Sequence, residues 1–343
     1  MRDYTNKTVY IGIDVHKKTY SVTAICNKEV IKKDTMIANP ENLLKYITKY
    51  FKEAKVYTAY EAGFPGFHLH RFLVKNCINN IVVHPASIEI SSRDRVKTDK
   101  RDSMKIASQL SNGVLRGIKV PSKKREDFRL ITRTRDQLVE NRKRTGNHLK
   151  SLLFLHGLIK PDDDRKITKK WICWVRELDV SEDIKYCIEL YVDEWLRLEE
   201  KISKITKRLS AQSQKDKEVD IMYRAVPGIG ALSARILANE LETMRHFTSE
   251  KQLFSYTGLT PSEYSSGEHK RQGKISRQGK SILRKILVQA AWRAIKQDTS
   301  LLKFFDRVSV RSGKKRAIVG VARKLIGRIR ATFITGELYL TAR

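Results

Sequence analysis

The chain has few cysteines and no long apolar run, and both absences narrow the class of protein. Its four cysteines lie far apart among 343 residues, and no two of them form a CxxC pair. This spacing argues against a structural zinc site and indicates a reducing, cytoplasmic environment. No stretch approaches the ~18 apolar residues of a membrane-spanning helix. Residues 1–7 also lack the apolar core of a signal peptide.

Acidic residues are scarce relative to basic ones. The chain has 69 Lys and Arg against 38 Asp and Glu, which gives a formal net charge of +31 and a pI near 10.0. Such an excess points to a polyanionic partner. Nucleic acid fits better than an anionic membrane surface, because no spanning segment or lipidation signal accompanies the charge. Hydrophobic residues make up 41% of the chain, enough for folded cores in two or three domains.

The first region, residues 1–120, shows the element order of an α/β nuclease domain of the ribonuclease H type. Strands are expected over 8–16, 18–26, 29–37, 55–60 and 81–84. The short connections between the first three favour an antiparallel meander. Helices are expected after the cap Asn39 and Pro40, over 67–74, and from Thr98 or Asp99 onward. We therefore predict a mixed sheet flanked by helices.

The second region, residues 121–220, is expected to be helical throughout. Two long amphipathic stretches, 123–158 and 182–213, are separated by a break at Pro161. The apolar residues of the second stretch fall near heptad spacing. The pair predicts a coiled-coil hairpin or a dimer contact, with two ordinary bundle helices as the alternative, and the spacing leaves these open.

The third region, residues 221–343, is expected to be mainly helical. It begins with Val226-Pro227-Gly228-Ile229-Gly230, which resembles the turn of a helix-hairpin-helix. In that motif backbone N–H groups can face a phosphate, so Gly228 and Gly230 are candidate nucleic-acid contacts. A plain turn that opens a helix is the alternative.

Four carboxylates form the candidate catalytic set. Asp14 and Glu61 each end a strand-like run, and Asp99 and Asp102 lie three residues apart at a helix start, on one face. Several carboxylate oxygens are what paired Mg²⁺ ions require, and such ions assist in-line phosphoryl transfer. The alternative is four unrelated surface acids, which the strand order and the basic surroundings disfavour.

Basic clusters accompany these acids and recur in the glycine-containing loop 258–279. They are candidates for phosphate binding: Lys17, Arg93, Arg95, Lys97, Lys100 and Arg101 near the acids, and Lys270, Arg271, Lys274 and Arg277 in the loop. The loop does not match a phosphate-binding loop of nucleotide hydrolases, because five residues rather than four separate Gly273 from Gly279.

The same loop contains Ser265-Ser266-Gly267. A serine in this setting could attack phosphorus if nearby cations or a metal ion activated its hydroxyl. Loop serines are common, so the residues alone favour a structural role.

Taken in order, these motifs resemble the transposases of the insertion-sequence 110 family, over nearly the whole chain. The resemblance is carried by Ile11–Lys17, Tyr60–Gly63, Lys97–Asp102, Val226–Gly230, Tyr256–Pro261, Ser265–Gly267, and Gly279 with Leu283-Arg284. It implies a RuvC-like domain, a helical coiled-coil segment and a transposase domain. In one respect the chain departs from the family pattern: Glu268 stands where a second glycine often follows Gly267.

The resemblance implies specific roles and partners. Asp14, Glu61, Asp99 and Asp102 would bind Mg²⁺, and Ser266, with Ser265 as its neighbour, would form a covalent phosphoserine link to DNA. A bridge RNA encoded by the mobile element would pair with donor and target DNA. Dimers would assemble into tetramers in a bacterial or archaeal, nucleoid-associated setting. The rival interpretations are a Holliday-junction-type nuclease that uses water and a nucleic-acid packaging protein.

Overall fold

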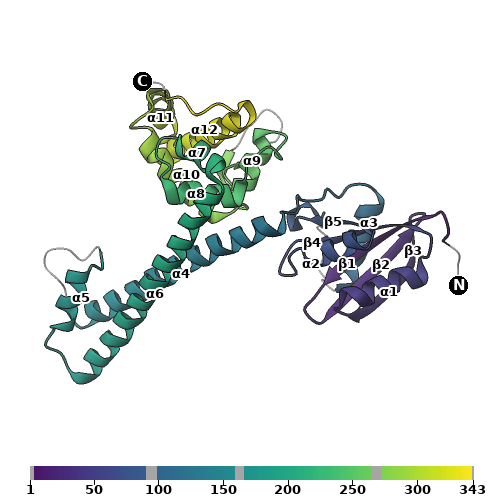
Figure 1. Cartoon of the computed structure of the whole chain (residues 1–343), viewed down its shortest axis with the longest axis horizontal. Helices are drawn as coiled ribbons and strands as arrows, with labels where there is room; N and C mark the ends of the chain where they lie inside the picture. The colour runs from purple at the N-terminus through teal and green to yellow at the C-terminus, as the bar shows by residue number, and fades with distance from the viewer. Residues whose placement is uncertain (1–3, 90–98, 159–165, 264–271, 342–343) are drawn as a thin grey trace. The chain divides into compact units, whose positions relative to one another are not determined.

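The computed structural model describes residues 4–89, 99–158, 166–263 and 272–341, and for residues 99, 100 and 272 only the backbone. The chain divides into two compact units, residues 1–121 and 122–343 (Figure 1). Among the described residues, no helix combines the length and apolarity needed to cross a bilayer.

The first unit contains a five-stranded mixed sheet in the order β3-β2-β1-β4-β5. The antiparallel strands are β1 (Thr8–Val15), β2 (Thr19–Cys26) and β3 (Glu29–Ile37). Running parallel to β1 are β4 (Lys55–Glu61) and β5 (Asn79–Val83). The predicted α/β fold class is confirmed, and each strand lies within two residues of its predicted bounds.

Helices cover both faces of this sheet. The first face is covered by α1 (Pro40–Tyr50) and α2 (His68–Lys75), which share a core with Val9, Ile11 and Ile13 of β1. The second face carries α3 (Asp99–Ser111), and the short helix η1 (Pro85–Ser87) follows β5. The predicted start of α1 is confirmed, because the Asn39 side chain accepts a hydrogen bond from the Glu41 N–H and proline opens the helix.

Two long helices, α4 (Lys123–Leu155) and α6 (Glu182–Lys215), lie side by side in the second unit (Figure 1). A short helix, α5 (Lys169–Arg176), packs on them through Trp171, which is 2% exposed. The sequence predicted the long helices but not α5. Whether the pair forms a dimer contact stays a prediction.

The rest of the second unit is a helical bundle with one small hairpin of strands. Its helices are α7 (Lys217–Arg224), α8 (Ala231–Leu241), α9 (Glu250–Thr257), α10 (Ser281–Ala294), α11 (Thr299–Ser312) and α12 (Lys314–Thr335). The hairpin pairs β6 (Pro261–Glu263) with β7 (Gln272–Ile275). The core lies between α8, α10 and α12, where Leu237, Leu287 and Leu325 are fully buried.

Arginines of α4 bind the end of α8. Arg133 donates two hydrogen bonds of 2.8 Å to the carboxylate of Glu240, whose side chain is fully buried. Arg129 donates to the carbonyl oxygens of Asn239 and Glu240, which lie in the last turn of α8. A cation at a helix C-terminus interacts favourably with the helix dipole. These charged contacts therefore hold α4 against α8.

A second charged cluster is centred on Arg235, which is 1% exposed. Its guanidinium lies 2.9 Å from Asp216 and 3.2 Å from Asp220. Burial raises the pKa of Asp220 to about 6, Arg235 partly offsets this, and the neighbouring charge of Asp216 raises it further. Arg224 and Arg125 act in the same direction as Arg235. Asp220 is thus a carboxylate whose ionisation opposes folding.

The free energy of unfolding is expected to fall as pH rises from about 4 to about 6 through the Asp220 contribution. Folded Asp220 holds its proton up to about pH 6, whereas the unfolded chain releases it near pH 4. The folded state thus binds more protons in this window, and the difference is on the order of 3 kcal/mol. Urea unfolding at several pH values should show that Asp220→Asn loses this slope. An equal slope in both proteins would contradict the assignment.

Candidate active site and nucleic-acid interface

The ends of two neighbouring parallel strands bring Asp14 and Glu61 to one edge of the sheet. Gly12 of β1 pairs in register with Ala59 of β4. Asp14 lies two residues after Gly12, and Glu61 lies two residues after Ala59, so the two acids are at the same level of the sheet. Side chains alternate between faces along a strand, and Ala59 packs toward Ile106 of α3. Asp14 and Glu61 therefore belong to the face that α3 covers.

The backbone of α3 touches the backbone of β1 at Gly12. A Cβ atom at Gly12 would lie 2.1 Å from the carbonyl oxygen of Ser103 and 2.3 Å from the Ala107 nitrogen. The Ser103 hydroxyl also lies 3.0 Å from the hydroxyl of Thr23 on β2. Asp102 directly precedes Ser103, so the backbone of Asp102 lies beside this contact. The contact itself is at Gly12, two residues before Asp14 on β1. Glycine is needed here because of the close approach of the two backbones.

Two of the described acidic side chains, Asp14 and Asp102, have partners close to them in sequence. Asp14 Oδ2 lies 3.0 Å from Nε2 of His16, and the Asp14 side chain is 19% exposed. Asp102 lies 3.8 Å from the ammonium group of Lys105, and Glu61 is exposed. His16 was not among the predicted site residues. The sequence pattern that could have identified His16 is strand alternation, which puts residues 14 and 16 on the same face of the sheet.

The donor set suits a hard divalent cation, since carboxylate oxygens are its preferred ligands. In the part of the chain that the structure describes, no three His, Cys, Asp or Glu side chains gather closely enough to hold a metal ion. The side chain of Asp99, the fourth predicted ligand, is outside the described residues, although its backbone begins α3. The carboxylate set therefore stays a prediction.

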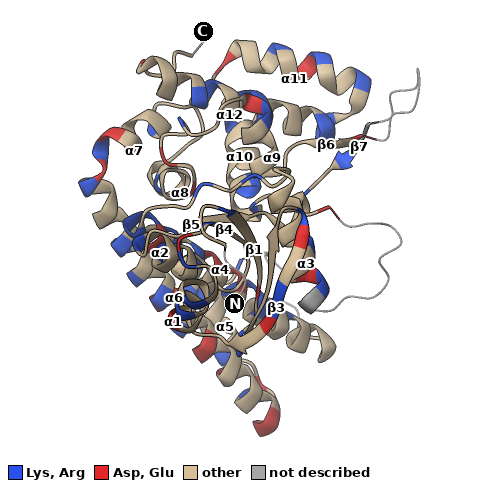
Figure 2. Cartoon of the chain, turned by 90° about the vertical axis from the view of Figure 1, so that its right-hand side faces the viewer, with Lys and Arg blue, Asp and Glu red and all other residues tan. Residues whose placement is uncertain are grey.

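Basic residues occur in both units (Figure 2). Among those predicted to bind phosphate near the acids, Lys17 and Arg101 are exposed. Lys100 has only a described backbone, and Arg93, Arg95 and Lys97 lie outside the described residues. Their role in phosphate binding stays a prediction.

Two glycines and an arginine hold the base of the β6–β7 hairpin. Gly258 ends α9 in a left-handed conformation, and a Cβ at Gly279 would lie 2.4 Å from the Gly258 nitrogen. Arg284 of α10 donates to the carbonyl oxygens of Gly279, at 2.6 Å, and Thr257, at 3.3 Å. The hairpin is therefore anchored where both of its ends meet the helices.

The segment between β6 and β7 carries several predicted site residues. Those that lie outside the described residues are Ser265, Ser266, Lys270 and Arg271. Lys274 and Arg277, which follow the segment, are exposed. The serine assignment stays a prediction.

The two glycines of the Val226–Gly230 turn have different surroundings. Gly228 has a φ of +82°, and a Cβ there would lie 2.5 Å from the carbonyl oxygen of Ala290. Gly230 is the N-cap of α8 and receives no side-chain capping bond, and a Cβ there would point into open space, with no atom outside the turn within 4 Å. Gly228 therefore serves packing, while the open N-terminus of α8 at Gly230 leaves backbone N–H groups for an anion.

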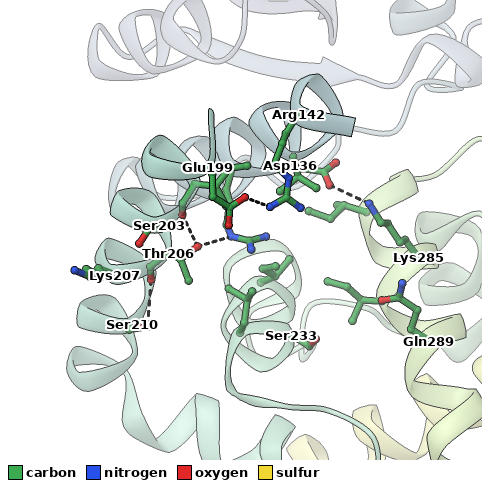
Figure 3. Close-up of a pocket in the computed structure, with 17 residues that line it drawn as sticks. Asp136, Arg142, Glu199, Ser203, Thr206, Lys207, Ser210, Ser233, Lys285 and Gln289 are labelled. Carbon is green, nitrogen blue, oxygen red and sulfur yellow. Dashed lines mark hydrogen bonds and ion pairs between the residues drawn. The ribbon is translucent and has the colours of Figure 1, made fainter. Parts of the chain in front are cut away.

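A cavity of about 650 Å³ lies between α4, α6, α8 and α10 (Figure 3). Arg142 forms an ion pair with Glu199, and Arg135 donates to the Thr206 hydroxyl at 2.8 Å. Lys285 lies 3.0 Å from Glu140. Three of its four cations thus have partners within the protein, and the fourth, Lys207, is exposed, so we interpret the cavity as a joint between helices rather than an anion site.

Comparisons with known proteins agree with this architecture. A family profile described as Transposase IS116/IS110/IS902 family matches residues 223–306. A transposase profile of the DEDD type from the IS110 group matches residues 11–156. These two matches define the class of protein as a DEDD-type transposase.

Individual relatives extend the likeness over most of the chain. A putative transposase of Sinorhizobium fredii is 30% identical over 300 residues, 78% of this chain and 74% of the relative. The transposase for insertion sequence element IS1533 of Leptospira borgpetersenii is 26% identical over 339 residues, 95% of this chain and 96% of the relative. The chain belongs to the IS110 family of transposases.

Replacing Gly12 by alanine is expected to lower the free energy of unfolding by about 2–3 kcal/mol, because α3 must move away from β1. Urea unfolding of the full chain measures this loss. Gly63→Ala is the matched control, since a Cβ at Gly63 meets its nearest atom at an ordinary 3.6 Å. Equal stability of Gly12→Ala and the native chain would refute the close contact.

At the Val226–Gly230 turn, Gly228→Ala is expected to destabilise the fold by more than about 1 kcal/mol, through positive φ and overlap with α10. Gly230→Asp should leave stability intact but weaken DNA binding about two- to fivefold, because its carboxylate caps α8 and repels phosphate. Thermal unfolding and fluorescence anisotropy separate the two effects. Unchanged DNA affinity of Gly230→Asp would remove Gly230 from the nucleic-acid interface.

Proposed function

We propose that this transposase excises and inserts its mobile element by cutting and rejoining DNA strands through a phosphoserine intermediate. The observation that carries the proposal is the placement of Asp14 and Glu61 at the ends of adjacent parallel strands, on the sheet face against which α3 brings Asp102. Acids at one edge of a sheet in a strongly basic chain suit phosphoryl transfer on a polyanion.

Asp14, Glu61, Asp99 and Asp102 would hold the divalent cation, which we propose is Mg²⁺. When bound, such an ion neutralises charge that develops on the reacting phosphate. His16, 3.0 Å from Asp14, would orient that carboxylate by a hydrogen bond to one of its oxygens. Lys17, Lys100, Arg101 and the basic residues at 93, 95 and 97 would bind flanking phosphates, which positions the strand without reading its sequence.

Ser266 would supply the nucleophile. Its Oγ forms a bond to phosphorus and loses its proton, while the bond from phosphorus to one sugar oxygen breaks and that oxygen leaves as a hydroxyl. Rejoining reverses this exchange with a hydroxyl from another strand, so the phosphodiester energy is conserved. The anchored base of the β6–β7 hairpin supports this role, because a nucleophile needs a fixed support. Lys270, Arg271, Lys274 and Arg277 would bind DNA beside it.

Three functional parts follow from this proposal: a metal-dependent domain over 1–120, a helical segment for dimerisation over 121–220, and a transposase domain over 221–343. A dimer that assembles into a tetramer would combine the carboxylates of one subunit with the serine of another. An element-encoded bridge RNA would choose the sites by base pairing. A protein that binds mainly through cations to backbone suits this division of labour.

Asp14→Ala and Ser266→Ala are each expected to abolish excision in cells while nucleic-acid binding persists, because each removes a reacting group and little binding surface. Asp127→Ala is the matched acidic control, since Asp127 is exposed and pairs only with Lys123 among the described residues. Ser265→Ala is the control for the serine and should retain excision. Normal excision by both variants would refute the site.

A denaturant-stable protein–DNA adduct separates the serine mechanism from a nuclease that uses water. The native chain should form the adduct, and Ser266→Ala should not. Adduct formation by Ser266→Ala but not by Ser265→Ala would transfer the nucleophile to Ser265. Cleaved DNA without any adduct would favour the water-using Holliday-junction-type nuclease.

Sequencing the RNA that co-purifies with the protein tests the proposed guide RNA, and a random population of cellular RNA would oppose it.

A further inference from the structure

Helices α11 and α12, which meet at Gly313, carry exposed cations that lie beyond both family-profile matches, which end at residues 156 and 306. We call this surface the basic hairpin. It consists of Arg307, Arg311, Lys314, Lys315, Arg316 and Lys324, all of them exposed. Figure 2 shows basic residues along both helices.

The sequence around the basic hairpin contains few acidic residues. Asp306 is the only acidic residue of the sequence between 299 and 335. Within the described residues, none of the six cations forms an ion pair with a carboxylate, in contrast to Arg142 and Lys285 of the cavity. Uncompensated like charges repel one another, so a polyanionic partner would relieve this repulsion.

One cation from each of the two helices lies over the same aromatic ring. Arg307 of α11 and Lys324 of α12 both lie over Phe304, at 5.7 and 4.8 Å from the ring centroid. Gly320 of α12 makes room for this ring, because a Cβ there would lie 3.3 Å from Phe304 Cε1. Arg311 follows Arg307 by one helical turn, about 6 Å along the same face. The positive surface is therefore preorganised.

The start of α12 adds to the positive potential. Gly313 is its N-cap and has no side chain to accept from the first N–H groups. Lys314, Lys315 and Arg316 occupy the first turn, which contains no acid. Cations there oppose the helix dipole, whereas an anion at this end would interact favourably with both the dipole and the side chains.

We propose that the basic hairpin docks on the phosphate backbone of duplex DNA, as a contact separate from the carboxylate edge and the β6–β7 hairpin. Two packed helices that present cations on consecutive turns, as Arg307 and Arg311 do on α11, suit a regular phosphate backbone. Recognition of single strands or RNA loops relies on exposed aromatic rings for stacking. On α11 and α12, Phe305 and Phe333 are buried and the ring of Phe304 is covered by two cations, so neither helix offers a ring for stacking.

The test compares two variants of the full chain that lose the same charge. The first is Arg307→Gln/Arg311→Gln/Lys315→Gln. The control is Arg197→Gln/Lys201→Gln/Lys204→Gln on α6, where Arg197 and Lys204 pair with Glu194 and Glu200. Fluorescence anisotropy with a short duplex DNA and with a structured RNA, over a range of salt concentrations, gives the affinity and its salt dependence.

For duplex DNA, the basic-hairpin variant should bind about tenfold more weakly, and its slope of log affinity against log salt should shrink by about 2 to 3, or about 0.9 per lost phosphate contact. The slope of the control variant should change by less than about 1. Equal changes of affinity and slope in both variants would show that only the overall charge of the protein matters, and would overturn the proposal. A loss confined to RNA would also overturn it. Should circular dichroism show unfolding, Lys314→Gln/Arg316→Gln/Lys324→Gln replaces the first variant.

Discussion

The candidate site depends on the contact between the backbones of α3 and β1. Three small or hydroxyl residues lie side by side across the sheet at this level: Thr23, Gly12 and Ala59, on β2, β1 and β4. Because Gly12 has no side chain, the backbone of α3 can contact the strand, and the hydroxyls of Thr23 and Ser103 form a hydrogen bond beside this contact. A larger side chain in this row would lift the helix and separate its acids from Asp14. Gly12 therefore sets how closely the backbone of α3 approaches the strand that carries Asp14.

The second unit depends on a different constraint, which is the pairing of buried charges. Arg133 with Glu240 joins α4 to α8, which are distant in sequence, and Arg235 of α8 binds Asp220 of α7 and Asp216 between α6 and α7. A buried pair contributes little net stability, but loss of one partner leaves a charge without compensation, so alternative packings of the helices are strongly disfavoured. The same criterion separates these structural cations from those of the basic hairpin, which form no ion pair with a carboxylate within the described residues.

Much of the local structure could be predicted from residue patterns. Asn39 and Pro40 start α1, alternating apolar residues define the strands, and the long amphipathic periods become α4 and α6. The failures have physical reasons. Helix α5 is too short for a periodic signal and is stabilised by burial of Trp171 against the long helices. The β6–β7 hairpin has few apolar residues, and its geometry comes from Gly258, Gly279 and Arg284.

The sequence by itself determined the class of partner, the α/β order of the first unit and the family, because charge, periodicity and ordered motifs are properties of the chain. Only the tertiary structure decided which glycines serve packing and which leave an open helix end. It likewise decided which of the many cations are paired inside the protein. These distinctions depend on contacts between segments far apart in sequence, such as Gly12 with Ser103 or Arg133 with Glu240, and no local pattern encodes them.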